Sequence, residues 1–308
     1  MKVVITGSTG FVGKNLKSYF ARNEIGVVCL DRKAVSPETI TWERISDVSK
    51  LSAGCIVHLA GKAHDTSKCS SPEEYYTINT ELTKHLFDQF VHSSVRDFIY
   101  FSSVKAVTDV VNGILDENEI PNPRTPYGQS KLKAEEYILA QDVPLGKRVI
   151  ILRPSMIHGP ENKGNLNLLF KIVKRGIPWP LAAFENKRSF LSIDNLCFLL
   201  KLVIENKNIP SGVYNCTDDE SLATNELIAL IGESIGKRPI FWRVPERLIN
   251  GVASLGDACH FPLNSERLRK LTENYVVSNE KLKMVLGVKR FPVSAREGLL
   301  KTFKSFNS

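Results

Sequence analysis

Short runs rich in β-branched residues alternate with amphipathic stretches of helical period through the first half of this chain. The alternation starts with the strand pattern KVVIT at 2–6, followed by helical spacing at 13–23. Further strand patterns cover 26–31, 55–61, 97–104 and 148–154, and further helical patterns cover 72–93 and 130–141. Because strands that alternate with helices build right-handed βαβ units, an α/β fold with a doubly wound parallel sheet is predicted.

The composition and the pattern of the sequence change after Pro154. Proline and glycine become frequent in HGPENKGN and RGIPWPLAA, and the alternation of strands and helices loosens. We therefore predict a first domain at 1–160 and a smaller C-terminal substrate lobe within 161–308, with 190–206 returning to the first domain. A chain of 308 residues is long enough for both.

The first strand-to-helix junction reads TGSTGFVG and places Gly7, Gly10 and Gly13 in the spacing G-x-x-G-x-x-G. Such a loop permits a tight turn, lets the backbone approach a pyrophosphate at the positive helix end, and lets helix pack on strand. A plain tight turn also explains glycines, but their position after the first strand favours a Rossmann-type dinucleotide site. Phe11 and Val12, which open the helix, belong to the same predicted site.

The second predicted strand ends at Asp31. A carboxylate there accepts hydrogen bonds from the ribose hydroxyls and repels a 2′-phosphate, which favours NAD. Arg32 and Lys33 follow at once and suit a 2′-phosphate, so NADP stays open. Asp47 is a candidate for contact with the adenine, and an ordinary loop carboxylate explains it equally well.

The formal net charge of +8 suits an anionic partner. The basic residues are scattered, without a long basic run or interleaved aromatic residues, so a phosphate-bearing small molecule fits better than nucleic acid. The six cysteines show no C-x-x-C spacing, which argues against a zinc site or a disulfide framework and favours the reducing cytoplasm. No apolar run reaches the ~18 residues of a transmembrane span.

Tyr127 and Lys131 stand four residues apart in TPYGQSKLKAEEYILA. Such a pair arises by chance about half a time in ~300 residues of ordinary composition, so its neighbours must decide. They are, in order, TGSTGFVG, Asp31, HLAG at 58–61, Asn79, FSSV at 101–104, YGQSK at 127–131 and LRPSMIHGP at 152–160. The ordered set resembles an extended short-chain dehydrogenase/reductase of the NAD-dependent sugar-nucleotide epimerase/dehydratase family, over nearly the whole chain.

The resemblance implies that Ser103, Tyr127 and Lys131 form the catalytic set, with Asn79 in support. A phenol has a pKa near ~10, and an ammonium one helical turn away favours the phenolate. Tyr127 would exchange a proton with a sugar hydroxyl or carbonyl while hydride moves to or from the nicotinamide. Ser103 would bond the same substrate oxygen, and Lys131 would hold the nicotinamide ribose. The implied cofactor site also includes Leu59, Ala60, Gly61 and Pro154.

The second lobe carries segments that resemble the family's nucleotide-sugar site. KGNLNLL at 163–169 resembles the segment that contacts the nucleotide base, which makes Asn165 and Leu166 candidates. NKRSFLSIDNL at 186–196 resembles the segment whose arginine binds the pyrophosphate, here Arg188, because a guanidinium forks two hydrogen bonds onto phosphate. Arg267 is a further candidate for a phosphate contact. Family members usually dimerise through the helices that here carry Asn79 and Tyr127, so a homodimer is expected.

Departures from the family pattern narrow the activity. Val104 and Lys105 stand where dehydratases carry an Asp-Glu pair, which argues against loss of water. Pro154, Ser155 and Met156 stand where many hexose epimerases carry an asparagine, which puts plain UDP-galactose specificity in doubt. His158 replaces a common tyrosine and is interpreted as a loop histidine with its hydrogen bonds satisfied.

Three hypotheses remain. The first is an NAD-dependent 4-epimerase of a UDP-hexose or UDP-N-acetylhexosamine. The second is an NAD(P)H-dependent 4-keto reductase of a UDP-4-keto-6-deoxy amino sugar in surface-polysaccharide synthesis. The third is a non-catalytic dinucleotide-binding protein on the same fold. The basic balance and the apolar stretch at 246–263 also raise peripheral membrane contact with a lipid-linked sugar, although an ordinary core helix explains that stretch.

Overall fold

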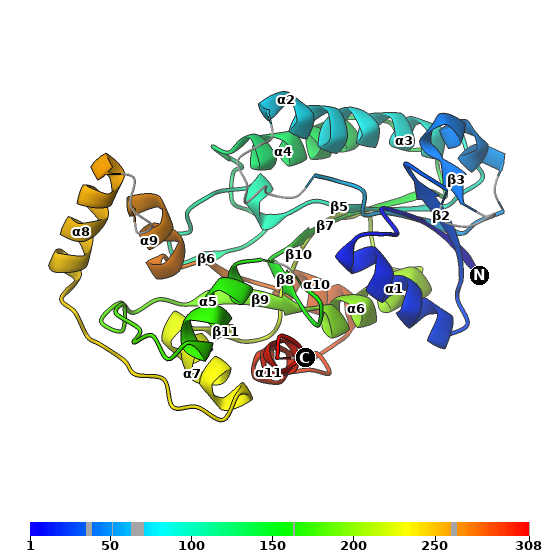
Figure 1. The fold of residues 1–308 in the computed structure, drawn as a ribbon. Helices are drawn as coiled ribbons and strands as arrows, with labels where there is room; N and C mark the ends of the chain where they lie inside the picture. Colours follow the sequence, from blue (N-terminus) through cyan, green and yellow to red (C-terminus); the bar gives the residue numbers. More distant parts are fainter. Residues whose placement is uncertain (35–38, 51, 63–70, 163, 260–263, 308) are drawn as a thin grey trace.

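A computed structural model describes residues 1–34, 39–50, 52–62, 71–162, 164–259 and 264–307, and its centre is a seven-stranded sheet (Figure 1). Neighbouring strands run parallel throughout the sheet. In spatial order the strands are β10 (Gly212–Cys216), β7 (Arg148–Pro154), β5 (Asp97–Phe101), β4 (Cys55–His58), β1 (Lys2–Thr6), β2 (Gly26–Asp31) and β3 (Ile40–Thr41). The predicted α/β fold with a doubly wound parallel sheet is confirmed.

Helices cover both faces of this sheet (Figure 1). On one face lie the 3₁₀ segment η1 (Trp42–Lys50), α2 (Pro72–Tyr75), the π-helical turn η2 (Tyr76–Glu81), α3 (Leu82–Val91) and α4 (Pro126–Leu139). On the other lie α1 (Phe11–Arg22), α6 (Ile193–Glu205) and α10 (Glu280–Leu286). Since both faces are covered, the strands are near-continuous apolar runs, and Val3, Val4 and Ile5 are all fully buried.

The second lobe is built around a three-stranded sheet in the order β11 (Ser221–Leu222), β9 (Arg188–Ser192) and β8 (Met156–His158). A separate apolar cluster holds it together. The helices of this lobe are α5 (Asn165–Lys174), α7 (Thr224–Ser234), α8 (Glu246–Cys259), α9 (Ser265–Thr272) and α11 (Ala295–Ser305). A small parallel pair of β6 (Ile114–Leu115) and β12 (Val276–Val277) ties this lobe to the segment after β5.

Several element boundaries differ from those predicted. The helix expected at 130–141 begins at Pro126, because Thr125 caps it by accepting a hydrogen bond from the Gly128 amide. The strands expected at 55–61 and 97–104 end at His58 and Phe101, and the helix expected at 13–23 begins at Phe11. The central sheet also takes up β10, which lies beyond the range 1–160. The segment 190–206 was expected to return to the first domain. Its part in α6 packs against α1 of that domain.

Some sequence-based interpretations fall on residues outside the described ranges, namely Cys69, Lys163 and the end of the apolar stretch at 260–263. Among the described residues, Cys29, Cys55, Cys197 and Cys216 are free thiols. The described helices include none with the length and apolar character needed to cross a membrane.

Candidate active site

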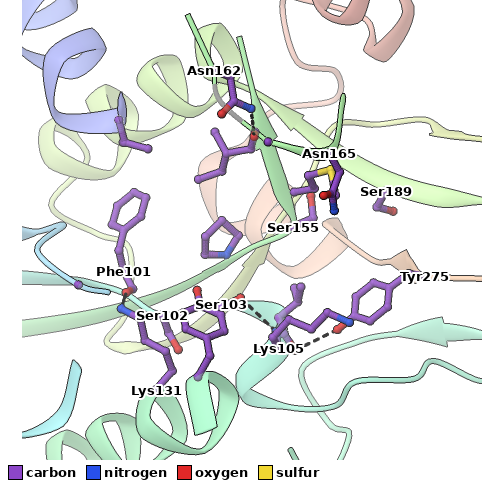
Figure 2. A pocket seen from close by; sticks show the side chains of 18 of the residues that line it. Phe101, Ser102, Ser103, Lys105, Lys131, Ser155, Asn162, Asn165, Ser189 and Tyr275 are labelled. Carbon is purple, nitrogen blue, oxygen red and sulfur yellow. Dashed lines mark hydrogen bonds between the residues drawn. The ribbon is translucent and has the colours of Figure 1, made fainter. Parts of the chain in front are cut away.

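A cavity of about 450 Å³ lies where the carboxyl ends of the central strands face the second lobe. Parallel sheets of this kind place their ligands at that edge. The first lobe contributes the ends of β5 and β7 and the start of α4, whereas the second contributes β8, the start of α5, β9 and Tyr275. Figure 2 shows Ser103, Lys105, Lys131, Asn165 and Tyr275 gathered around this space.

The glycine loop has the geometry that dinucleotide binding requires. Gly7 adopts a left-handed φ of 67°, and a Cβ there would lie 2.9 Å from the backbone of Ala60. A Cβ on Gly13 would meet the carbonyl oxygen of Gly7, so helix α1 packs close to the strand. Gly10, the N-cap residue of α1, provides no side-chain cap, and Phe11 and Val12 follow it. The first amides of α1 therefore suit a phosphate group, and these residues fit a dinucleotide.

Asp31 lies at the end of β2, almost fully buried, beside the glycine loop. Its Oδ1 accepts a hydrogen bond from the Ser8 amide at 2.9 Å, and its Oδ2 accepts one from the Ser8 hydroxyl at 2.5 Å. The carboxylate thus holds the loop in place, and each oxygen keeps a second lone pair for a ribose hydroxyl. Arg32 follows, exposed. Asp47 forms ion pairs with Arg44 and Lys50, which lower its pKa, and so has the surroundings of an ordinary surface carboxylate.

Ser103, Tyr127 and Lys131 all line the cavity. Ser103 follows β5, and its hydroxyl accepts a hydrogen bond from the Lys105 amide at 3.1 Å. Tyr127 stands in the first turn of α4, half-buried, with its ring edge-on to Tyr75 at 6.3 Å. Lys131 lies one turn further along and is almost fully buried. The structure therefore brings the three expected catalytic side chains to one place.

The electrostatics of this set differ from the expectation. The Lys131 ammonium donates a hydrogen bond to the carbonyl oxygen of Phe101 at 2.7 Å (Figure 2). Burial raises the pKa of Tyr127, and the Ser103 hydroxyl is the neighbour that lowers it. Burial also lowers the pKa of Lys131 to about 8. Desolvation is the largest effect on the pKa of both groups, and the favouring of the phenolate by Lys131 stays a prediction.

Asn79 is fully buried in the π-helical turn η2, where it joins two parts of the site. Its Oδ1 accepts from the Lys62 amide at 2.7 Å, and its Nδ2 donates to the Ser130 hydroxyl at 3.0 Å. A Cβ on Gly61 would lie 3.0 Å from both Asn79 Oδ1 and Lys131 Nζ, so a larger residue there would press on both side chains. Because Asn79 is fully buried and hydrogen-bonded, it is not a solvent-exposed helix residue.

A hydrogen-bond chain through His58 was not anticipated from the sequence. The Ala60 amide donates to Thr6 Oγ1, which lies 2.7 Å from His58 Nδ1. His58 Nε2 lies 2.9 Å from Thr83 Oγ1, which donates to the Asn79 carbonyl. Burial lowers the pKa of His58 to about 3, so the ring is neutral. The chain connects the backbone beside Gly7 to the turn that carries Asn79.

The substrate-side candidates do not all meet at the cavity. Asn165 and Leu166, in the first turn of α5, line it, and so does Arg188 at the start of β9. The Arg188 guanidinium also donates to the carbonyl of Lys270, and burial lowers its pKa. Arg267 is exposed on α9 and is not among the lining residues. Leu59, Gly61 and Pro154 line the cavity, whereas Ala60 contributes its amide to Thr6.

Lys105 and Tyr275 are lining residues that the sequence analysis did not assign to the site. The Lys105 ammonium stands 4.0 Å from the centre of the Tyr275 ring and donates to the Asp109 carbonyl at 3.0 Å. Burial lowers the pKa of Lys105 to about 8. The only sequence signal was the position of Lys105, two residues after Ser103. His158 is not on a loop but in β8, fully buried, with Nδ1 2.9 Å from Thr302 Oγ1. Its Nε2 has no hydrogen-bond partner in the described part of the chain, so the interpretation as a histidine with satisfied hydrogen bonds is also wrong.

Fold and cavity together define an NAD(P)-dependent enzyme of the extended short-chain dehydrogenase/reductase class. Residues 3–217 match the model of the NAD dependent epimerase/dehydratase family. UDP-glucose 4-epimerase of Vibrio cholerae is 30% identical over 257 residues, which cover 79% of this chain and 78% of that protein. The chain belongs to the NAD-dependent epimerase/dehydratase family.

Two further comparisons extend over nearly the whole chain. N-acetyl-alpha-D-glucosaminyl-diphospho-ditrans,octacis-undecaprenol 4-epimerase of Escherichia coli O157:H7 is 27% identical over 299 residues, covering 94% of this chain and 86% of that protein. The solved structure of UDP-glucuronic acid 4-epimerase from Bacillus cereus, in complex with UDP-glucuronic acid and NAD, superposes with a TM-score of 0.76. That match covers 100% of this chain and 99% of the other at 19% identity, and supports the fold.

Proposed function

We propose that this protein is an NAD-dependent 4-epimerase acting on a UDP-hexose or a UDP-N-acetylhexosamine. The observation that carries the proposal is that Ser103, Tyr127 and Lys131 line one cavity with Arg188 from the second lobe. A tyrosine acid/base and a phosphate-binding guanidinium in one cavity suit a sugar diphosphate whose carbinol reacts at the tyrosine.

The cofactor residues are assigned as follows. Gly7, Gly10 and Gly13, with the amides at Phe11 and Val12, hold the pyrophosphate, and Asp31 receives the adenosine ribose. Lys131, beside Gly61 and Asn79, holds the nicotinamide ribose with the ammonium that now bonds the Phe101 carbonyl. Leu59 and Pro154, which line the cavity, would contact the nicotinamide ring. Held by these residues, NAD would supply the hydride acceptor for C4 and, once reduced, the hydride donor.

Proton transfer is assigned to Tyr127. As a phenolate, Tyr127 would take the proton of the C4 hydroxyl during oxidation, and the resulting phenol would return that proton during reduction. The Ser103 hydroxyl bonds the same substrate oxygen and lowers the pKa of Tyr127 against the effect of burial. Asn79 holds two parts of the site in place. Its side chain bonds the Lys62 backbone on one side and the Ser130 hydroxyl, near Tyr127, on the other.

Substrate binding is assigned to the second lobe. Arg188 binds the diphosphate, and Asn165 and Leu166, at the start of α5, contact the nucleotide base. For epimerisation, the hexose must present either face of C4 to the nicotinamide within this cavity of about 450 Å³. Lys62, Lys105, Lys131 and Arg188 are the charged residues among the cavity's described lining, and their positive charge matches a diphosphate.

A specific observation favours the second candidate, an NAD(P)H-dependent 4-keto reductase of a UDP-4-keto-6-deoxy amino sugar. Both oxygens of Asp31 already bond Ser8, and Arg32 beside it is exposed. An exposed guanidinium directly after the end of β2 suits a 2′-phosphate. The epimerase stays the first choice because the position of Asp31 still favours NAD.

The test is a panel of UDP-sugars incubated with purified protein and followed by NMR, with and without added NADH or NADPH. Epimerisation without any added dinucleotide, together with NAD released on denaturation, supports the epimerase. Stoichiometric consumption of NADPH with a 4-keto sugar overturns it in favour of the reductase. No turnover in either arm, with nucleotide still bound, leaves a non-catalytic binder.

Assembly and location are part of the proposal. A homodimer is proposed through α3 and α4, on which Leu82 and Tyr137 are half-buried and Leu139 is 59% exposed. The free thiols of four cysteines are in keeping with the reducing cytoplasm. Light scattering that gives a monomer mass across the micromolar range would contradict the dimer.

A further inference from the structure

The chain from Ile240 to Leu255 exposes an unusual amount of apolar surface. Six large apolar side chains in this stretch are exposed, including Trp242 at 54%, Leu248 at 62% and Leu255 at 64%. We call Ile240, Phe241, Trp242, Leu248, Val252 and Leu255 together the 240–255 surface. Exposed apolar side chains that gather in one stretch of chain are typical of an interaction site.

Helix α8 carries more apolar residues than the core of the second lobe covers. Ile249 and Ala253 are buried in the apolar cluster of the second lobe. Leu248, Val252 and Leu255 follow the spacing i, i+4, i+7, so they form one face beside the buried pair. That second apolar face is exposed, and α9 is the element against which α8 mainly packs.

The segment before α8 holds its apolar side chains outward by backbone bonds. The Trp179 amide donates to the Ile240 carbonyl at 2.7 Å, and the Trp242 amide donates to the Trp179 carbonyl at 2.8 Å. The backbone is therefore fixed while Phe241 and Trp242 remain exposed. Figure 1 shows this segment and α8 along the same outer edge of the molecule.

Cations accompany this apolar surface. Lys237, Arg238, Arg243 and Arg247 are all exposed, and Glu246 is the sole acidic residue between positions 237 and 255 of the sequence. Exposed Trp and Leu beside several Lys and Arg are the composition of a segment that lies in a membrane interface. A second copy fits less well, because a two-fold interface would bring these like charges together.

We propose that the 240–255 surface docks this protein onto the headgroup region of a bilayer that contains anionic lipid. The inference goes beyond the proposed function and does not depend on it. Helix α9, against which α8 packs, carries the Lys270 carbonyl that accepts from Arg188 of the cavity. The docking surface thus lies one helix away from Arg188 of the cavity.

The experiment is co-sedimentation of the full chain with vesicles of phosphatidylcholine alone, or of phosphatidylcholine with phosphatidylglycerol. We expect binding to the anionic vesicles that weakens as salt is raised. The Leu248→Glu/Leu255→Glu variant should lose at least ~10-fold in partitioning, because it places charge on the inserted face. The Arg243→Glu/Arg247→Glu variant should lose a similar factor on anionic vesicles.

Matched controls lie on a different part of the chain. Met284 on α10 is 80% exposed and Lys289 is exposed after it, so Met284→Glu and Lys289→Glu repeat the two kinds of change elsewhere. Both controls should bind vesicles like the unaltered chain, and all variants should keep its melting temperature.

Three results would overturn the inference. One is absence of binding by the unaltered chain to anionic vesicles at low salt. Another is equal loss of binding in the Met284→Glu control. The third is a dimer in light scattering that the Leu248→Glu/Leu255→Glu variant converts to a monomer without any vesicle binding, which would assign the surface to a second copy. None of these readouts involves turnover, so they are independent of the test of the proposed function.

Discussion

At the scale of single residues, the proposed chemistry depends most on Tyr127. Removing its hydroxyl in Tyr127→Phe should lower kcat by ~10²–10⁴-fold, because the acid/base group is lost. Among the described residues that line the cavity, the other phenol is Tyr275, and its hydroxyl already donates to the carbonyls of Val104 and Thr108. Dinucleotide content and melting temperature should stay unchanged. Tyr137→Phe on the same helix removes a hydrogen bond to Asp88 at 2.6 Å and serves as the control that keeps its turnover.

Burial of the Lys131 ammonium should lower the free energy of unfolding by an amount that depends on pH. Burial lowers its pKa from 10.5 to about 8, so between these values the unfolded chain holds a proton that the folded chain has released. Stability therefore rises with pH across this window, and at pH 7 the folded chain bears the full cost of a buried charge. We compare the free energy of unfolding of Lys131→Met with that of the unaltered chain, both free of dinucleotide. The difference in favour of the variant should be larger at pH 7 than at pH 10 by up to ~3 kcal/mol.

Denaturant unfolding of both proteins at several pH values measures this difference. A gap that stays constant from pH 7 to pH 10 would mean that Lys131 keeps its ordinary pKa in the folded chain. Lys105, whose pKa burial also lowers to about 8, contributes the same slope to both proteins and cancels.

The sequence predicted which residues meet better than it predicted how they interact. Ser103, Tyr127 and Lys131 could be placed together because strand ends and helix starts share one edge of a parallel sheet. The pKa of Tyr127 could not be predicted, since desolvation depends on surrounding side chains such as Tyr75 that only the fold brings near. In the sequence, Lys105 indicated only that the acidic pair of the dehydratases is missing. Its contact with Tyr275 could not be predicted, because Tyr275 lies far along the chain.

At the scale of elements, the junction of β1 and α1 is where glycine is required by contact. A Cβ on Gly13 would meet the Gly7 carbonyl and lie 2.7 Å from Ser8 Cα, both of them backbone. Gly13→Ala should therefore cost ~1–3 kcal/mol of stability and abolish tight dinucleotide binding, because the helix must move away from the loop.

Gly251 provides the matched control. It lies inside α8 with nothing within 4 Å of its added Cβ, so Gly251→Ala should stabilise the protein by up to ~1 kcal/mol. Thermal unfolding and NAD titration by protein fluorescence would compare the two variants. Equal NAD affinity in Gly13→Ala and the unaltered chain would contradict the assignment of the loop.

Element types were easier to predict than element ends. The apolar spacing at 72–93 correctly indicated a helix, but nothing in that spacing marks the π-helical turn at Tyr76–Glu81. The turn shows itself only through contacts, since it lets Asn79 reach the Lys62 backbone and Ser130 together. The helical range 130–141 starts four residues later than α4, which begins at Pro126 because Thr125 is its N-cap and Pro126 its N1 residue.

At the scale of the whole molecule, the first lobe is not continuous in sequence. The sheet takes β10 from beyond residue 160, and α6 covers one of its faces. Val3, Ile5, Ile99 and Ile150 share an apolar cluster with residues of α6 and β10, of which Leu200 is one. A periodic pattern in one stretch cannot reveal such a pairing, because it reports that a strand or helix exists and not where it packs.

The division at residue 160 is tested by expressing the fragment 1–160. Without α6 and β10, one sheet face loses its cover and β7 becomes an edge strand, so the fragment should show no cooperative unfolding transition and should aggregate. The fragment 1–217 regains both elements and should recover strand and helix content by circular dichroism, although it still lacks the packing of α10 and α11. A sharp melting transition with NAD binding in the 1–160 fragment would establish it as an autonomous domain, and would mean that the burial of Val3 and Ile5 beneath α6 contributes little to its stability.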